Sequence, residues 1–124
     1  MRYMMLIYSQ ETEAATPEDM RAVATAHGTL MAEVRSRGIL CAADPLQASG
    51  TATLVRVQDG AALITDGPYA ETKEQLAGYY ILECKDLDEA LAWAAKIPTA
   101  CAGAAGCVEV RPIREFPQRA PVNA

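Results

Sequence analysis

Two short segments, residues 3–8 and 79–84, carry apolar or aromatic side chains at successive positions rather than at alternate ones, with Glu83 as the exception. In an extended strand, neighbouring side chains point to opposite faces, so both faces of these two strands are predominantly apolar. Strands of this kind are covered on both sides in a folded protein. We therefore expect a sheet with protein packed against each of its faces.

Two other segments have the periodicity of amphipathic helices. The first has Thr16 as a capping residue, Pro17 at the first helical position and Gly38 as its terminator. The second begins at Asp86, opens with a capping-box-like pattern and ends before Pro98. The expected buried stripe of the first is Met20, Val23, Ala24, Leu30, Met31 and Val34. The expected buried stripe of the second is Leu87, Ala90, Leu91 and Ala94.

Further strands are expected from alternating patterns and turn residues. Asp59-Gly60 between two alternating runs is a strong signal for a β-hairpin. Asp44-Pro45 indicates a turn or bulge near the end of a strand. The polar residues 69–78 are interpreted as a connecting loop. These further strands cover residues 39–46, 53–58, 61–65 and 108–111.

The resulting order is strand, helix, strand, hairpin, strand, helix, strand. It predicts an α+β, ferredoxin-like fold, in which an antiparallel sheet has two helices on one face. A chain of 124 residues fits one domain. We place this domain at residues 1–116 and expect a flexible C-terminal tail at 117–124.

Two helices can cover only one face of such a sheet. The other face would then expose tyrosines and large aliphatic side chains, a larger apolar patch than a monomer usually carries. A second copy packed sheet to sheet around a two-fold axis is the simplest cover. The sequence therefore predicts a homodimer.

Charge and hydropathy argue against several classes of partner. The formal net charge is −5, and the lysines and arginines are scattered singly, so we expect no nucleic-acid binding. No stretch approaches the ~20 apolar residues of a membrane span. The apolar N-terminus is too short for a signal peptide, so a cytoplasmic location is expected.

The four cysteines are Cys41, Cys84, Cys101 and Cys107, and none forms a C-x-x-C pair. With one histidine in the chain, a zinc site would need ligands from several distant segments, so free and mostly buried thiols are the simpler interpretation. A disulfide framework is not expected in a chain this large and apolar. No phosphate-binding loop or dinucleotide fingerprint occurs, so we expect neither a cofactor nor a metal.

His27 is the sharpest candidate for chemistry. It lies on the apolar stripe of the first predicted helix and should face the sheet, where an imidazole can act as a general acid or base near neutral pH. The alternative is a core or pocket-lining histidine without a chemical role. Asp66, at the end of a strand, and Asp44 are candidate partners for it. Either carboxylate could instead only stabilise its own turn.

Arg111 and Tyr79 are candidate ligand-binding residues. Arg111 could bind a carboxylate in a pocket, or it could form a cross-strand or intersubunit ion pair with Glu109. Tyr79 could contact a ligand, although aromatic residues of this kind more often belong to a core or an interface.

Residues 65–80, which include Asp66-Gly67-Pro68-Tyr69, resemble the signature of the YCII-related family, in the branch called DGPF-domain proteins. Residues 86–94 and 108–112 resemble the later segments of that family. Tyr69 stands where the family usually has phenylalanine. The resemblance spans nearly the whole chain and implies a dimeric α+β barrel, in agreement with the pattern of strands and helices.

The resemblance implies less about activity. In the wider family, a helix histidine paired with an aspartate has been proposed as an acid–base pair acting on small molecules, and His27 lies at the expected spacing before Gly38. Some members are associated with extracytoplasmic-function sigma factors. The leading hypothesis is a cofactor-free lyase or isomerase in which His27 moves a proton and Asp66 or Asp44 orients it. The alternative is a non-catalytic dimeric module that binds a ligand or a regulatory protein such as a sigma factor.

Overall fold

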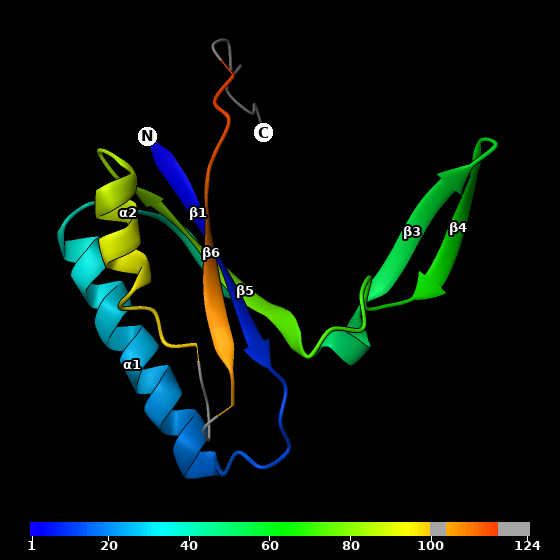
Figure 1. The fold of residues 1–124 in the computed structure, drawn as a ribbon, viewed down its shortest axis with the longest axis horizontal. Helices are drawn as coiled ribbons and strands as arrows, with labels where there is room; N and C mark the ends of the chain where they lie inside the picture. Colours follow the sequence, from blue (N-terminus) through cyan, green and yellow to red (C-terminus); the bar gives the residue numbers. More distant parts are fainter. Residues whose placement is uncertain (100–103, 117–124) are drawn as a thin grey trace, which may run out of the picture.

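The computed structural model describes residues 1–99 and 104–116. Four of its strands form one antiparallel sheet in the order β2-β5-β1-β6, and β3 and β4 form a separate two-stranded sheet. Both helices lie on one side of the larger sheet (Figure 1), so the predicted ferredoxin-like α+β fold is confirmed. The elements are β1 (Arg2–Gln10), α1 (Pro17–Ser36), β2 (Leu40–Pro45), the 3₁₀ helix η1 (Ser49–Thr51), β3 (Thr53–Gln58), β4 (Ala61–Asp66), β5 (Glu74–Glu83), α2 (Leu87–Ala94) and β6 (Gly106–Pro112).

The core lies between the larger sheet and the two helices. Alternate side chains of β1 and β5 point inward, and they pack against small and aliphatic residues of α1 and α2. The largest members of this core are Tyr3, Met5, Ile7, Leu30, Val34, Tyr80, Leu82, Trp93 and Ile97. The opposite sides of the same strands are apolar too, as predicted, and are partly exposed: Met4, Leu6, Tyr8, Tyr79 and Ile81. We call these five residues the open face.

The ends of α1 follow the predicted capping chemistry. The Thr16 hydroxyl accepts a hydrogen bond from the Asp19 N–H at 3.1 Å, and the Asp19 carboxylate accepts one from the Thr16 N–H at 2.9 Å. At the other end, Gly38 has φ +69° and its N–H bonds to the Arg35 carbonyl, while the next N–H reaches back to Val34. This is a Schellman arrangement, which requires the left-handed conformation that glycine tolerates.

Two strand details differ from the sequence prediction. β5 begins at Glu74, so part of the predicted 69–78 loop is a strand, because β1 continues to Gln10 and pairs with this polar stretch through the backbone. The irregularity in β2 lies between Leu40 and Ala42 rather than at Asp44-Pro45. Pro45 is tolerated because β2 is an edge strand and needs no donor on its outer side.

The predicted buried stripes are only partly correct. In α2, Ala90, Trp93 and Ala94 are buried, whereas Leu87 and Leu91 are exposed. The side of the helix that faces the core is therefore the one that carries Trp93. In α1, Leu30 and Val34 are buried, while Met20 and Ala24 are exposed. Burial is lost toward the N-terminal half of α1, where a cavity separates part of the helix from the sheet.

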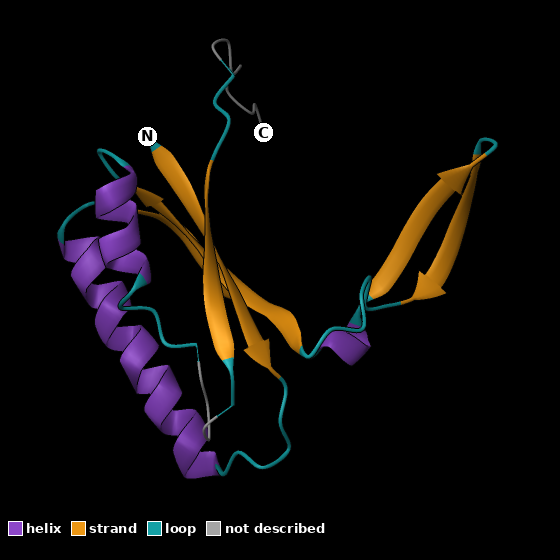
Figure 2. Ribbon diagram, viewed as in Figure 1, coloured by secondary structure: helices purple, strands orange, loops and turns teal. Residues whose placement is uncertain are grey.

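The predicted hairpin is present, but it does not join the main sheet. Its turn has φ +49° at Asp59 and +77° at Gly60, as in a type I′ turn. Figure 2 shows this hairpin standing away from the body of the protein, on the side of the sheet opposite the helices. We call residues 53–66 the arm. Apart from the half-buried Leu54, every residue of its two strands is exposed.

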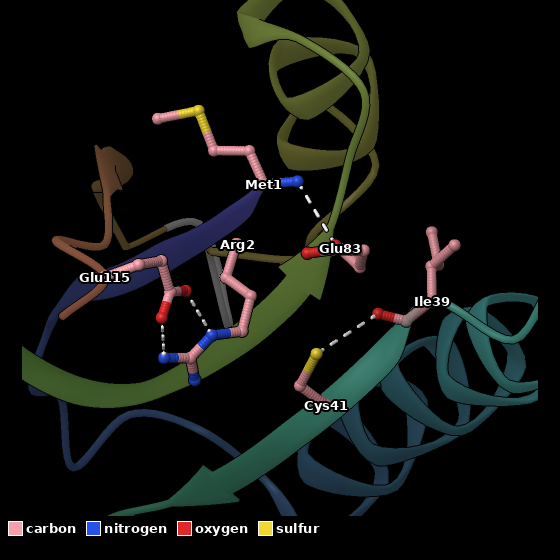
Figure 3. A network of polar contacts seen from close by, with 6 residues as sticks. All are labelled: Met1, Arg2, Ile39, Cys41, Glu83 and Glu115. Atoms are coloured by element: carbon pink, nitrogen blue, oxygen red, sulfur yellow. Dashed lines mark hydrogen bonds and ion pairs between the residues drawn. The ribbon is translucent and has the colours of Figure 1, made fainter. Parts of the chain in front are cut away.

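Polar contacts tie the N-terminal strand to its neighbours (Figure 3). Arg2 donates two hydrogen bonds to the Glu115 carboxylate, at 2.6 and 3.0 Å, and the N-terminal amine lies 3.2 Å from the Glu83 carboxylate. All of these side chains are in contact with solvent, and Arg2 is the least exposed at 26%, so each contact contributes little to stability.

Three of the cysteines are described as free thiols. Cys84 is buried, but Cys41 and Cys107 are exposed, so the prediction of mostly buried thiols is wrong for these two. Cys101 and the predicted tail at 117–124 lie outside the described residues. Within residues 1–99 and 104–116, no cluster of His, Cys, Asp and Glu could hold a metal ion. No helix in that same part of the chain is long and apolar enough to cross a membrane.

Candidate functional site

A cavity of about 440 Å³ lies between α1 and the larger sheet, near the end of β2. This volume falls within the usual range of small-molecule pockets. Most of the wall is apolar and comes from Ile7, Ala24, Gly28, Met31, Ala43, Pro45, Ala77, Gly78 and Pro98. The polar residues that contribute to the wall are few: Ser9, His27, Asp44, Tyr79 and Tyr80.

His27 lines this cavity, where its helical spacing predicts that it faces the sheet. Its Nδ1 lies 2.7 Å from the hydroxyl of Tyr80, which β5 directs inward beside Leu82. The two rings are nearly parallel, at 17°, with centroids 5.9 Å apart. A residue of the helix and a residue of the sheet therefore form one hydrogen-bonded pair at the cavity wall.

Burial shifts the pKa values of these two groups in opposite directions. It lowers the pKa of His27 and raises the pKa of Tyr80, because desolvation disfavours both the imidazolium and the phenolate. Both groups are thus neutral near pH 7. The Nε2 atom of His27 has no hydrogen-bond partner among the residues that the structure describes.

The neutral pair has two tautomers with different chemistry. If the Tyr80 O–H donates to Nδ1, the proton of the imidazole is on Nε2, which can then donate to a bound molecule. If the Nδ1–H donates to the Tyr80 oxygen, Nε2 carries the free lone pair of a base. The same geometry can therefore give or take a proton at Nε2.

Asp44 lines the same cavity but is joined to a different residue. The Tyr79 hydroxyl donates to Asp44 Oδ2 at 2.7 Å across the β2–β5 pair. This hydrogen bond is the main cause of the raised pKa of Tyr79, and desolvation is the second. Across the described ranges, no hydrogen bond joins His27 to Asp44, so the structure brings these two candidates to one cavity without pairing them.

The other candidates lie elsewhere. Asp66 is the exposed last residue of β4, in the arm, and is not part of the cavity wall. Arg111 is exposed on β6, opposite Met4, and also lies outside that wall. Among the described residues it forms no ion pair with Glu109, whose carboxylate instead accepts a hydrogen bond from Tyr8 at 3.4 Å.

Sequence reasoning missed two groups of the site. Tyr80 is not among the residues that the sequence points to, although alternation along β5 places it inward, where it can meet His27. Ser9 also lines the cavity, and its hydroxyl donates to the Thr99 carbonyl at 2.8 Å. No sequence signal marks that contact, because it joins residues that are far apart in the chain.

Comparison with known proteins gives a consistent result. A family model described as the YCII-related domain matches residues 1–117. The chain is also 35% identical, over 115 residues, to an uncharacterized protein of Rhizobium meliloti (strain 1021), and the alignment covers 91% of this chain and 92% of that protein. The matched region includes both the cavity and the arm.

Proposed function

The chain belongs to the YCII-related family, and from this premise we propose that it is a cofactor-free acid–base enzyme acting on a small, largely apolar molecule. The molecule would bind in the cavity under α1, with His27 as the group that exchanges a proton. The observation that carries this proposal is the 2.7 Å contact between His27 Nδ1 and the Tyr80 hydroxyl, which leaves Nε2 free on a cavity-lining ring.

Proton balance in this proposal involves two atoms of the bound molecule. With Nδ1–H donating to Tyr80, Nε2 takes a proton from an activated C–H or O–H group of the ligand. The imidazolium then returns that proton to a second atom of the ligand in an isomerase, or to a leaving group in a lyase. Tyr80 holds the ring in place in both steps, and its raised pKa keeps its own proton in place.

The wall of the cavity also limits the class of ligand. No lysine or arginine contributes to the described wall. A negatively charged ligand would find no counter-charge there. Neutral molecules with an apolar body and one or two polar groups fit this wall best.

A second candidate, a non-catalytic ligand-binding or regulatory module, is favoured by one observation. His27 bonds to a tyrosine rather than to a carboxylate, so the imidazolium would lack a negative partner. In this reading His27 only contributes a hydrogen bond to a bound ligand. The protein partner would then be a regulatory protein, of which an extracytoplasmic-function sigma factor is one candidate.

Proton exchange distinguishes the two candidates without knowledge of the natural substrate. We would incubate the protein in D₂O with small neutral carbonyl compounds and follow deuterium incorporation by NMR. An enzyme accelerates exchange for at least one compound, and His27→Gln lowers that rate by about 100-fold or more. Tyr80→Phe should give an intermediate loss. If binding occurs without accelerated exchange in any compound, the module is the correct description.

We also propose that two copies pair across the open face. Its five residues are apolar over most of their surface and lie on the side of the sheet away from both helices. Burying them would supply the cover that strands apolar on both sides require. A monomer at ~10 μM in light scattering would refute this pairing. Ile81→Asp, on the open face, should raise the dissociation constant at least tenfold.

A further inference from the structure

We propose that the arm packs against a second copy of this chain, with one aliphatic face of the arm as the contact surface. This inference rests on the proposed pairing across the open face and assigns a role to a part of the fold that the pocket does not use.

The two faces of the arm differ in chemistry. Cross-strand pairing places Val55 opposite Ile64 and Val57 opposite Ala62 on one face, whose polar pair, Thr53 and Asp66, lies at the base of the arm. Val55, Val57 and Ile64 have exposed fractions of 63%, 72% and 69%. The other face carries Arg56, Gln58 and Thr65, together with Ala61, the half-buried Leu54 and Leu63, which is less exposed at 44%. A two-stranded hairpin is marginally stable alone in water, so an aliphatic face on it indicates a surface that is covered.

The position of the arm indicates what covers it. In Figure 1 the helices lie on one side of the larger sheet and the arm extends on the other, the side of the open face. A second copy seated on the open face would therefore lie beside the arm. Two-fold symmetry would make the contact reciprocal, so each copy would be held by the arm of the other.

The base of the arm is fixed to the body, so its direction is defined by the fold. The Glu11 carboxylate accepts hydrogen bonds from the Ser49 N–H at 2.7 Å and from the Ser49 hydroxyl. The Gly67 N–H donates to the Ala52 carbonyl at 2.8 Å. A Cβ at Gly67 would lie 2.8 Å from the Ala52 Cβ, so only glycine allows this close approach.

The accessible surface supports a partner of the size of a second copy. The chain exposes 8836 Å², whereas a compact monomer of 13.3 kDa exposes about 6,450 Å². The area of a fully extended chain with the composition of residues 100–103 and 117–124 is about 1,650 Å². Those residues can therefore account for no more than this part of the difference between the two areas. The described residues thus carry an excess of at least roughly 700 Å². A specific interface buries about 800 Å² on each partner.

Neighbouring residues on opposite faces of β4 provide a matched test. Ile64→Asp places a charge on the aliphatic face, and Leu63→Asp places the same charge at the next position on the other face. We would measure the dimer dissociation constant of the full chain by analytical ultracentrifugation. Ile64→Asp should raise it at least tenfold, and Leu63→Asp should change it less than threefold. Circular dichroism verifies folding, and Val57→Asp replaces Ile64→Asp if that variant unfolds.

The outcomes separate this inference from the pairing on which it rests. A dimer that is broken by Ile81→Asp but not by Ile64→Asp would overturn the role of the arm and leave the open-face pairing intact. Equal effects of Ile64→Asp and Leu63→Asp would also overturn it. A monomeric wild type would refute both and leave the arm to a different partner. As a second measurement, amide exchange at Val55 and Ile64 should slow as protein concentration rises, and concentration-independent exchange would contradict the inference.

Discussion

Gly28 offers a direct test of whether the cavity is the ligand site. It lies on α1 and lines the cavity, and a Cβ built there meets no heavy atom within 4 Å. Gly28→Ala should raise the free energy of unfolding by up to ~1 kcal/mol, since glycine is unfavourable inside a helix. For a chain of this length, that corresponds to roughly 3–6 °C in melting temperature. Gly28→Leu should keep much of this gain and also fill part of the cavity.

The volume that leucine removes can be estimated from the structure. Four side-chain heavy atoms of about 30 Å³ each occupy roughly 120 Å³. That is about a quarter of the cavity volume of about 440 Å³. A neutral ligand that occupies the cavity next to α1 should then bind at least tenfold more weakly, whereas Gly28→Ala should bind it nearly as well as the wild type.

The assay needs a probe with an apolar body and one hydrogen-bonding group, and we suggest 2-naphthol. Its binding can be followed on the imidazole NMR signals, which are unambiguous because the chain has one histidine. A stable Gly28→Leu variant that binds the probe within twofold of the wild type would refute the placement of the ligand beside α1. If Gly28→Ala also loses binding, the change in the helix, rather than the filled volume, causes the loss.

Three further predictions concern stability. Burial lowers the pKa of His27 in the folded state, so the unfolded chain binds more protons than the folded chain below pH ~6.5. The free energy of unfolding should therefore decrease as the pH falls from about 6.5 toward the lowered pKa. Urea unfolding at pH 7.5 and 5.5 should show this loss, and His27→Gln should reduce it. Met5→Ala, at a fully buried position, should cost about 2–5 kcal/mol in chemical denaturation, whereas Met4→Ala on the open face should cost the folded subunit much less. Thr16→Ala removes the side-chain acceptor of the α1 capping box and should lower the free energy of unfolding by about 1 kcal/mol, measurable from the shift of the urea midpoint.

Local signals in the sequence account for most of the fold. Caps, a Schellman glycine and a type I′ turn act over a few residues, so Thr16, Gly38 and Asp59-Gly60 are read correctly without knowledge of the rest of the chain. The start of β5 could not be read in this way. Residues from Glu74 onward are in a strand because the backbone of β1 pairs with them, and backbone pairing leaves no trace in side-chain polarity.

The candidate site was only partly predictable for a related reason. Helical periodicity placed His27 toward the sheet, because that inference needs only the spacing within α1. The identity of its partner depends on where a residue 53 positions away lies in space. The carboxylates that the sequence suggests as partners are therefore not the partner that the fold supplies, which is Tyr80. Asp66 is a candidate because it ends a strand, but that strand belongs to the arm and not to the sheet beneath His27.

The consecutive tyrosines of β5 connect the two proposals physically. Alternation directs Tyr80 toward His27 and Tyr79 toward the open face, where its hydroxyl bonds to Asp44. If a second copy covers the open face, the Asp44–Tyr79 hydrogen bond moves into a drier environment, where a carboxylate acceptor binds its donor more strongly. Asp44 also lines the cavity. Pairing of two chains would thus stiffen one edge of the pocket, and ligand affinity should be higher in the wild-type dimer than in a folded Ile81→Asp monomer.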